Sequence, residues 1–487
     1  MLTTLVFSPL VGALLLMLAP RDNQRLLYKL NIAAALIPLA LVLLLWPPFL
    51  SNTMLSLLES RPWIPTIGAS YALRIDGLNL PFVTMIAFLV SIAALMSIHT
   101  DTHARRRNIL LLLWEITLFG AFMAWDYVLF ILFWAAGTIP VYYFIETDLE
   151  PKGQGEHREG RLPKARTFVF SSLLSIVALA SGLLILSASL EAPAFAVDDL
   201  VDLVTTNLSP TTQWWAFLSI FMGNALRLPI FPIHIWLPLT LPHLPIGAGM
   251  VLIGGFIPLG IYGLLRFAMT VLPDANAAYT VVLAMAGVVN LIFGSLAALG
   301  KEERLGKAGY QTMVYTGTAL IATATFTVAG MNAALFTMLA LGLAMAYTLV
   351  LNAPNCDQDG LKTWPLLFYA LDAAQQLRLP GFPGFIGLSI AFSAAFRGLP
   401  KMSLSIIVAL ILIAIDYGRL LSALLGDGHG SSEYSRSTPN LSLSCLMTRT
   451  GAAAILLLAG SVALGSKPDI VIKIIEPAIR QIMPLLN

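Results

Sequence analysis

The sequence predicts an all-α polytopic membrane protein with about 14 transmembrane helices. Of the 487 residues, 58% are hydrophobic and 11% are charged, and the mean hydropathy is +0.83. A soluble domain has about 25% charged residues. Apolar runs of roughly 20 residues, the length that crosses a bilayer, follow one another along the whole chain. No stretch between these runs is long enough for a soluble domain, which predicts one transmembrane domain over 1–487.

The apolar runs define the predicted spans in chain order. They are 2–20, 30–50, 79–98, 109–125, 127–145, 168–190, 212–230, 246–270, 278–299, 309–330, 332–352, 365–396, 403–425 and 449–466. The first run lacks a preceding basic segment and a small-residue cleavage site, so it is predicted to be a retained span. The longest polar stretches, 146–166 and 426–448, are predicted to be loops.

Basic residues are concentrated in the loops that follow odd-numbered spans. Those loops carry Arg21, Arg25, Lys29, Arg105, Arg106, Arg107, Lys152, Arg158, Arg161, Lys164, Arg166, Lys301, Arg304, Lys307 and Lys362. The loops after even-numbered spans carry few, namely Arg61, Arg74, Arg397 and Lys401. The positive-inside rule therefore predicts that the odd loops face the cytoplasm or its equivalent. Both termini are predicted on the opposite, periplasmic or lumenal side.

Spans 7 and 12 contain residues that interrupt a helix. These are Pro229 and Pro232 in span 7, and Pro380, Gly381, Pro383 and Gly384 in span 12. Proline removes a backbone donor, and inside a bilayer the freed groups must be satisfied by protein or by a water-lined cavity. Paired broken helices in two halves of a chain are typical of transporters. Because each break is fourth in a run of five spans, we predict two inverted five-helix repeats, at 109–270 and 278–425.

Four motifs in chain order carry a family resemblance. They are IDGLNLPF (75–82), DYVLFILFWAAGTIPVYYF (126–144), RLPIFPIHIWLPLTLPHLPIGAGMVLIGGFIPLGIYGLLRF (227–267) and LRLPGFPGFIGL (377–388). They resemble the antiporter-like membrane subunits of respiratory complex I, and most of all the chain 4 type of NAD(P)H–quinone oxidoreductase. The resemblance extends over nearly the whole chain. It implies fourteen spans with both termini outside.

The resemblance implies a non-redox subunit in the membrane arm of a proton-translocating, quinone-reducing complex. Its partners would be other membrane subunits in the lipid bilayer, with no nucleic acid, and its location a bacterial inner membrane or a thylakoid. The chain has no dinucleotide fingerprint, and Cys356 and Cys445 form no cluster or metal spacing. We therefore expect this chain to bind no cofactor or metal. NAD(P)H or ferredoxin, quinone and iron–sulfur clusters are implied only in partner subunits.

The sequence departs from the family at the positions that the resemblance assigns to the proton path. The family's titratable residues in spans 5, 8, 10, 11 and 12 are replaced here by Ala135, Pro258, Tyr315, Leu341 and Leu388. A proton relay needs groups that bind and release a proton near the working pH. Alanine, proline and leucine cannot do so. We therefore expect the chain's own proton channel to be degenerate.

Three ionisable residues remain as candidates for a polar path. Arg227 stands where the family has a lysine in span 7, but arginine keeps its proton at physiological pH, so it is expected to pair with an acid or attract an anion. Glu115 in span 4 is a candidate acid for that pairing. His234 titrates near neutrality, and we expect it to hydrogen-bond backbone freed near Pro229. Asp126, at the start of span 5, is expected to cap a helix.

Three functions are compatible with these residues. The first is a membrane-arm subunit of an NAD(P)H–quinone oxidoreductase-like complex whose own proton channel is degenerate. The second is a working proton or cation transporter subunit, similar to those of Mrp antiporters, with a different path built on Glu115, Arg227 and His234. The third is a structural scaffold for assembly, without a quinone-reducing partner complex.

Overall fold

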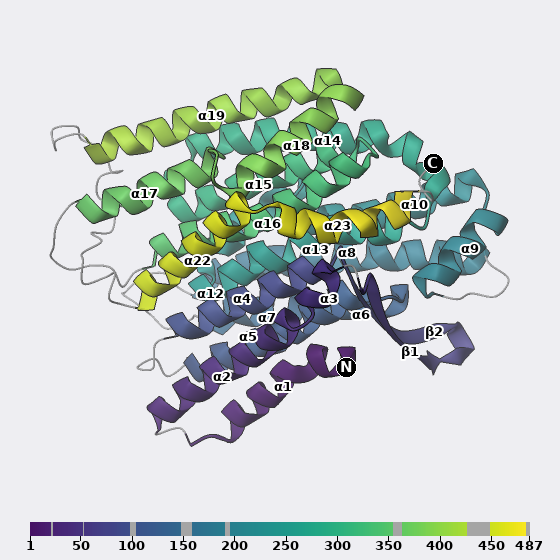
Figure 1. Ribbon diagram of the computed structural model, residues 1–487, viewed down its shortest axis with the longest axis horizontal. Coiled ribbons are helices and arrows are strands. Elements are labelled where there is room, and N and C mark those ends of the chain that lie inside the picture. The colour runs from purple at the N-terminus through teal and green to yellow at the C-terminus, as the bar shows by residue number, and fades with distance from the viewer. Residues whose placement is uncertain are drawn as a thin grey trace.

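The structure is a computed structural model that describes residues 1–20, 23–51, 53–97, 104–147, 158–189, 195–353, 363–425 and 449–483. Cys356, Cys445 and the predicted loop at 426–448 lie outside these residues. The long helices lie side by side along one direction, and the chain begins and ends at the end of the bundle that carries a β-hairpin (Figure 1). Backbone groups satisfied within helices, as here, are what a bilayer requires of a spanning chain.

The N-terminal part of the chain holds three helices, a hairpin and a fourth helix. Its elements are α1 (Leu2–Leu18), α2 (Gln24–Leu43), α3 (Trp46–Leu50), β1 (Ser56–Ile64), the 3₁₀ turn η1 (Pro65–Ile67), β2 (Ala69–Asp76) and α4 (Leu80–Met96). Strands β1 and β2 pair in an antiparallel ladder from Ser56 opposite Asp76 to Ile64 opposite Ala69. The hairpin connects spans 2 and 3 and was not predicted from the sequence.

The next set of helices corresponds to predicted spans 4 to 8. It comprises α5 (Ala104–Met123), α6 (Tyr127–Ala136), α7 (Thr138–Thr147), α8 (Arg158–Ser189), α9 (Val197–Asn207), α10 (Pro210–Arg227), η2 (Ile233–Ile235), α11 (Trp236–Thr240), η3 (Leu241–His243), α12 (Ile246–Val251), η4 (Leu252–Phe256), α13 (Pro258–Gly263) and η5 (Leu264–Met269). Segments η4 and η5 are π-helical. Two sequence predictions are corrected here: α8 begins at Arg158, so 158–166 is helix rather than loop, and α9 was not predicted.

The remaining helices follow the predicted order. They are α14 (Pro273–Gly300), α15 (Arg304–Thr323), α16 (Val328–Leu351), α17 (Thr363–Gln376), α18 (Pro383–Gly398), α19 (Pro400–Leu425), α22 (Arg449–Ser466) and α23 (Asp469–Ile482). The assignment of Arg304 and Lys307 to a loop is wrong, because both lie in the first turn of α15 and Lys307 is buried. Helix α23 buries one apolar face and packs against α16 and α3.

Eight helical stretches among the described residues are long and apolar enough to cross a membrane. They are Gln24–Leu50, Tyr127–Glu146, Ala165–Ser189, Ile246–Met269, Ala278–Gly300, Val328–Leu351, Pro400–Leu420 and Arg449–Ser466. Two shorter apolar helices, α1 and α4, accompany them. The chain is therefore a multi-pass helical membrane protein. The count of fourteen spans and the division into two repeats stay predictions.

Two helices that are buried over nearly their whole length form the centre of the bundle. They are the 246–269 helix (α12 to η5) and α16. They cross at two glycines, because a Cβ added at Gly342 would lie 3.0 Å from the Cα of Gly254. Small residues at such a crossing let two membrane helices approach closely. Helix α10, which precedes the first break, packs against the 246–269 helix, whereas α17 and α18, on either side of the second break, pack against α16.

The hairpin is tied to the helices by two carboxylates. Glu59 of β1 accepts a hydrogen bond of 2.7 Å from the Thr3 hydroxyl of α1 and another from the Thr3 N–H at 3.2 Å. These bonds, the side-chain one foremost, lower the pKa of Glu59 to about 2. Asp126 accepts from the Val128 and Leu129 N–H groups, as expected of an N-cap, and its other oxygen accepts from Ser70 of β2. One side chain thus caps α6 and holds β2.

Candidate functional site

The first helix break follows α10. The helix ends at Arg227, residues 228–232 are not helical, and a 3₁₀ turn then leads into α11. The freed backbone is bridged by protein groups: Trp236 Nε1 donates to the Leu226 carbonyl at 2.9 Å, and the Phe231 N–H donates to Asn290 Oδ1 of α14 at 3.1 Å. Such replacement bonds are what allow an interrupted helix to persist in a bilayer.

Arg227 lies between two aromatic rings beside this break. Its guanidinium carbon is 3.5 Å from the ring centroid of Trp134 and 3.7 Å from that of Phe256, and we call these two rings the Arg227 cage. Nη2 donates to the Trp134 carbonyl at 3.0 Å. Nη1 has no hydrogen-bond partner among the described residues, and the whole side chain is only 3% exposed. The cage therefore supplies cation–π attraction but no negative charge.

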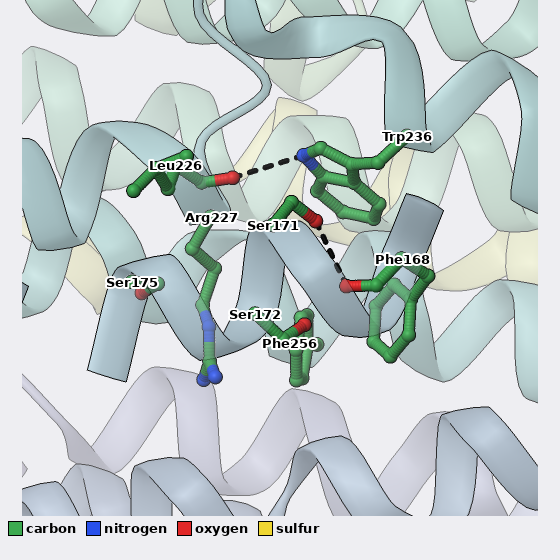
Figure 2. Close-up of a pocket in the computed structure, with 8 residues that line it drawn as sticks. All are labelled: Phe168, Ser171, Ser172, Ser175, Leu226, Arg227, Trp236 and Phe256. Carbon is green, nitrogen blue, oxygen red and sulfur yellow. Dashed lines mark hydrogen bonds between the residues drawn. The ribbon is translucent and has the colours of Figure 1, made fainter. Parts of the chain in front are cut away.

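A small cavity adjoins this arginine. It is lined by Phe168, Ser171, Ser172, Ser175, Leu226, Arg227, Trp236 and Phe256 (Figure 2), and we call it the Arg227 cavity. Ser175 is held in place because its hydroxyl donates to the Gly223 carbonyl at 2.7 Å and accepts from Trp134 Nε1 at 3.0 Å. The three serines come from one helix, α8, so that helix forms the polar wall of the cavity.

Glu115 and His234 do not join Arg227 in a polar path. Glu115 is fully buried in α5, and neither of its carboxylate oxygens has a hydrogen-bond partner in the described part of the chain. The His234 ring packs against Phe231 and Phe293, with ring centroids 5.7 and 4.8 Å away. Its buried Nδ1 has no partner among the described residues. The side chain nevertheless hydrogen-bonds to the backbone of Pro232, in keeping with the bond to freed backbone expected at this break. The three candidates are therefore separate side chains rather than a chain of contacts.

The second break separates α17 from α18. Arg378 and Gly381 have φ angles of +54° and +99°, in the left-handed region. Arg378 is 3% exposed, its Nη1 donates to Thr318 Oγ1 of α15 at 3.1 Å, and its guanidinium carbon lies 4.4 Å from the Tyr315 ring centroid. Its Nε and Nη2 have no partners among the described residues. In each break, a buried arginine thus lies two residues before the first proline.

Both breaks share a short sequence that the sequence analysis missed. Residues 227–232 read RLPIFP and residues 378–383 read RLPGFP, so five of the six positions are identical. A comparison of the two predicted broken spans residue by residue would have found this signal. The similarity places a buried arginine two residues before a proline in both halves of the molecule.

A face of α15 leads from its first turn toward the second break. It consists of Lys307, Gln311, Tyr315 and Thr318, and we call it the α15 polar face. The spacing of four, four and three residues places these side chains on one side of the helix. Lys307 Nζ contacts Asp416 Oδ1 of α19 at 2.8 Å, and Gln311 donates to the hydroxyl of Tyr417 at 3.1 Å. The face was missed because its first residue was counted as a loop cation.

Further polar groups line the space next to the α15 polar face. Thr348 of α16 donates to Asp372 of α17 at 2.6 Å, and Gln376 donates to Thr348 at 3.0 Å. Together with Lys307, Asp416 and their neighbours, Asp372 and Thr348 line one small cavity. The second half of the molecule therefore holds a connected group of polar and titratable side chains.

The five substituted channel positions lie on five different helices. Ala135 is half-buried near the end of α6, and its carbonyl accepts from Thr138 at 2.7 Å. Pro258 is the first residue of α13, and one residue separates it from η4. Tyr315 is buried on the α15 polar face, whereas Leu341 in α16 and Leu388 in α18 lie among apolar neighbours. In the described part of the chain, no group of three or more His, Cys, Asp and Glu side chains is placed to hold a metal ion.

Comparison with known sequences identifies relatives of this chain. Residues 124–364 match the family described as NADH:quinone oxidoreductase/Mrp antiporter, transmembrane. A NAD(P)H-quinone oxidoreductase chain 4 of Synechococcus sp. is 29% identical over 429 residues, which cover 85% of this chain and 80% of the relative. Another chain 4, from Microcystis aeruginosa, is 28% identical over 466 residues, with coverage of 91% and 82%.

Solved structures have the same fold. A chain of respiratory complex I from Thermus thermophilus superposes with a TM-score of 0.83 at 22% identity and full coverage of both chains. A chain of the Mrp complex from Dietzia sp. gives 0.82 at 16% identity, with 100% of this chain and 99% of that chain covered. Both are parts of multisubunit membrane assemblies. The chain is therefore a polytopic membrane protein that is similar to these proteins, and its residues 124–364 match the NADH:quinone oxidoreductase/Mrp antiporter transmembrane family.

Proposed function

We propose that the chain is a membrane-arm subunit of an NAD(P)H–quinone oxidoreductase-like complex, and that the first half of the subunit conducts no protons. The relatives support the first part of this proposal, and the observation that carries the second part is the Arg227 cage. Arginine holds its proton at physiological pH, and here it is fixed between two rings with one backbone hydrogen bond. Ala135 and Pro258 add no group that exchanges a proton, and Glu115 is isolated. A relay needs neighbouring groups that pass a proton on.

The second half of the subunit favours a different conclusion. The α15 polar face, with Asp416 and Asp372 opposite it, offers hydrogen-bonding and titratable groups from the first turn of α15 to Arg378. Ionisable side chains within a membrane protein are costly and are retained at ion or proton pathways. Any proton movement through this subunit is therefore proposed to follow the α15 polar face. A transporter function similar to that of Mrp subunits would therefore use the α15 polar face rather than Glu115, Arg227 and His234.

Proton flux into vesicles that carry the complex tests this division. Lys307→Met and Asp416→Asn each remove one member of the buried pair and are expected to lower flux at least tenfold. Arg227→Met, in an equally buried position, is expected to leave flux within about twofold, because a group that keeps its proton takes no part in a relay. A loss in Arg227→Met as large as that in Lys307→Met would contradict a non-conducting first half.

Restoring a carboxylate at one position is a second test of the first half. Ala135→Glu alone is expected not to raise proton flux, since Pro258 and the fixed charge of Arg227 still interrupt a path through the first half. Flux is measured in the same vesicles against the parent protein. A several-fold gain from this single substitution would show that the first half retains a working path.

Purification in mild detergent tests whether the chain assembles with partners. The relatives are named as chains of a quinone oxidoreductase, and the structures with this fold come from complexes. A tagged full chain is therefore expected to recover other membrane subunits together with quinone reductase activity carried by them. Recovery with cation-exchange activity instead would favour the Mrp-like alternative. Recovery of the chain by itself would favour a scaffold that does not belong to a quinone-reducing complex.

The membrane and its orientation are part of the same proposal. The cyanobacterial relatives and the asymmetry of basic residues support a thylakoid or bacterial inner membrane, with both termini on the lumenal or periplasmic side. Impermeant reagents applied to sealed vesicles of known orientation test this. Tags at both termini are expected to react from the lumenal side, and reaction of either tag from the cytoplasmic side would contradict the assignment.

A further inference from the structure

We propose that the Arg227 cavity binds a single monatomic anion of the chloride class. This goes beyond the proposed function, which requires no ligand at this place. The cavity combines a buried cation, a free N–H donor and the Ser172 hydroxyl, with aromatic side chains in its lining. The hydroxyls of Ser171 and Ser175 donate to backbone carbonyls. Figure 2 shows the guanidinium of Arg227 lying beside Ser172, Ser175 and Phe256.

The first reason to expect a bound anion is the unpaired charge of Arg227. Its side chain is 3% exposed, and its contacts are one carbonyl and two ring faces, all of them without net charge. A buried ion without an opposite charge is strongly unfavourable, and charged side chains within membranes are almost always paired. Cation–π attraction offsets only part of this penalty. An anion at the free Nη1 would complete the neutralisation.

No carboxylate of the chain supplies that anion among the described residues. Glu115 is the acid that the sequence offers, and both of its oxygens are without hydrogen-bond partners. The ion pairs of the described residues that involve buried arginine or lysine join Arg266 to Asp76 and Lys307 to Asp416. Arg227 therefore differs from those cations, which are each matched to an aspartate.

The size of the cavity limits the kind of anion. Its volume is about 10 Å³, close to the roughly 10–15 Å³ that one water molecule requires. A space that holds about one water-sized group fits a single-atom anion such as a halide better than nitrate, bicarbonate, sulfate or phosphate, which each contain several non-hydrogen atoms. The Ser172 hydroxyl and Nη1 of Arg227 are the donors that such an ion would meet. The chemical class is thus a small, compact, monovalent anion.

The buried arginine of the other break serves as the matched control. Arg378 is equally buried and also has nitrogens without partners among the described residues. The small cavity beside the α15 polar face does not include Arg378, and its lining pairs two cations, Arg304 and Lys307, with two carboxylates, Asp372 and Asp416, so it has no excess positive charge. Removing the charge of Arg378 should therefore leave anion binding at Arg227 unchanged.

Thermal unfolding of the full chain in nanodiscs of neutral lipid tests the proposal. Sodium chloride is exchanged for sodium gluconate at constant ionic strength. A ligand that binds only the folded protein raises its stability with its concentration until saturation. The unfolding midpoint of the parent protein is expected to rise saturably with chloride and bromide, but not with gluconate or sulfate. Arg227→Met is expected to abolish the rise, and Arg378→Met to retain it.

Two further variants keep the test decisive if Arg227→Met fails to fold. Ser172→Val removes a donor and narrows the cavity, and is expected to raise the half-saturating chloride concentration at least tenfold. Glu115→Gln is expected to leave the chloride response unchanged. A parent protein without a chloride response, an equal response to gluconate, or a full response in Arg227→Met or Ser172→Val would overturn the proposal. A chloride response that appears only in Glu115→Gln would also overturn it, because Glu115 would then be the natural counter-charge.

Discussion

The two helix breaks contain nearly the same six residues in different surroundings. RLPIFP at 227–232 and RLPGFP at 378–383 each place an arginine that is 3% exposed ahead of a proline. Arg227 is held between Trp134 and Phe256, with serines on one side. Arg378 rests on Tyr315 and donates to Thr318, close to polar side chains of three helices. Local sequence produces the break, and the residues packed around it decide what the buried charge can do.

The partners of the two arginines come from distant parts of the chain. Trp134 lies 93 residues before Arg227, whereas Thr318 lies 60 residues before Arg378. The first surroundings hold the cation between two rings, and we propose that they exchange no protons. The second contain hydroxyls, amides and carboxylates that can pass a proton among themselves. The comparison predicts that variants at the first break change stability and anion response, and that variants at the second change proton movement.

The largest expected loss of unfolding free energy follows from removing one ring of the Arg227 cage. Trp134→Ala removes a fully buried ring, its hydrogen bond to Ser175 and one face of the cage. A Trp→Ala change in a core costs about 3–5 kcal/mol of unfolding free energy. The control Trp215→Ala, at a side chain that is 54% exposed, should cost less than about 1 kcal/mol. Denaturant titrations of both variants measure the difference, and similar losses would show that the cage contributes no particular stability.

Glycine at the two arginine positions separates backbone from side-chain effects. Arg378 has φ +54°, where a residue other than glycine costs about 1 kcal/mol. Arg227 is the last residue of a regular helix, where glycine brings no such relief and costs less than the roughly 1 kcal/mol of a helix interior. Arg378→Gly is therefore expected to be about 1–2 kcal/mol more stable than Arg227→Gly, although both variants lose a buried guanidinium. Equal unfolding free energies would mean that side-chain packing outweighs the backbone at both breaks.

A smaller difference in unfolding free energy is expected when the hydroxyl group near each arginine is removed. Ser175 donates at 2.7 Å and accepts at 3.0 Å, so Ser175→Ala leaves two buried groups without their partner and should cost about 1–3 kcal/mol. The Tyr315 hydroxyl reaches its acceptors only at 3.5 Å, so Tyr315→Phe should cost less than about 1 kcal/mol. Unfolding free energies of both variants check the order, and the reverse order would indicate that the second break is the more tightly bonded one.

Most of the helical architecture could be predicted from the sequence. Every apolar run of the predicted spans overlaps a helix, and the chain leaves its helix at the predicted prolines of spans 7 and 12. These features are local, because hydrophobic length and proline chemistry act within a few residues. The Asp126 cap is local in the same sense. Loop boundaries were less accurate, since the polar residues 158–166 continue α8 as helix.

The candidate site could be predicted only in part, because its chemistry depends on contacts between distant helices. Sequence reasoning singled out Arg227 but could not foresee Trp134 and Phe256 on its two sides. It offered Glu115 as a partner, which the described contacts do not support. Lys307 was counted by charge alone as a loop residue, although the four-residue spacing to Gln311 and Tyr315 carried a helical signal. Pairing with Asp416, 109 residues later, is not encoded in any local pattern.

The two π-helical segments of the 246–269 helix have a consequence for variation in chain length. A π segment accommodates one more residue than an α-helix of similar rise, and one residue turns a helix by about 100°. Deleting one residue within 252–256 would restore a regular helix but swing Phe256 away from Arg227 or Pro258 away from its present neighbours. Single-residue insertions and deletions in this buried segment are therefore expected to change the packing around Arg227 more than substitutions do.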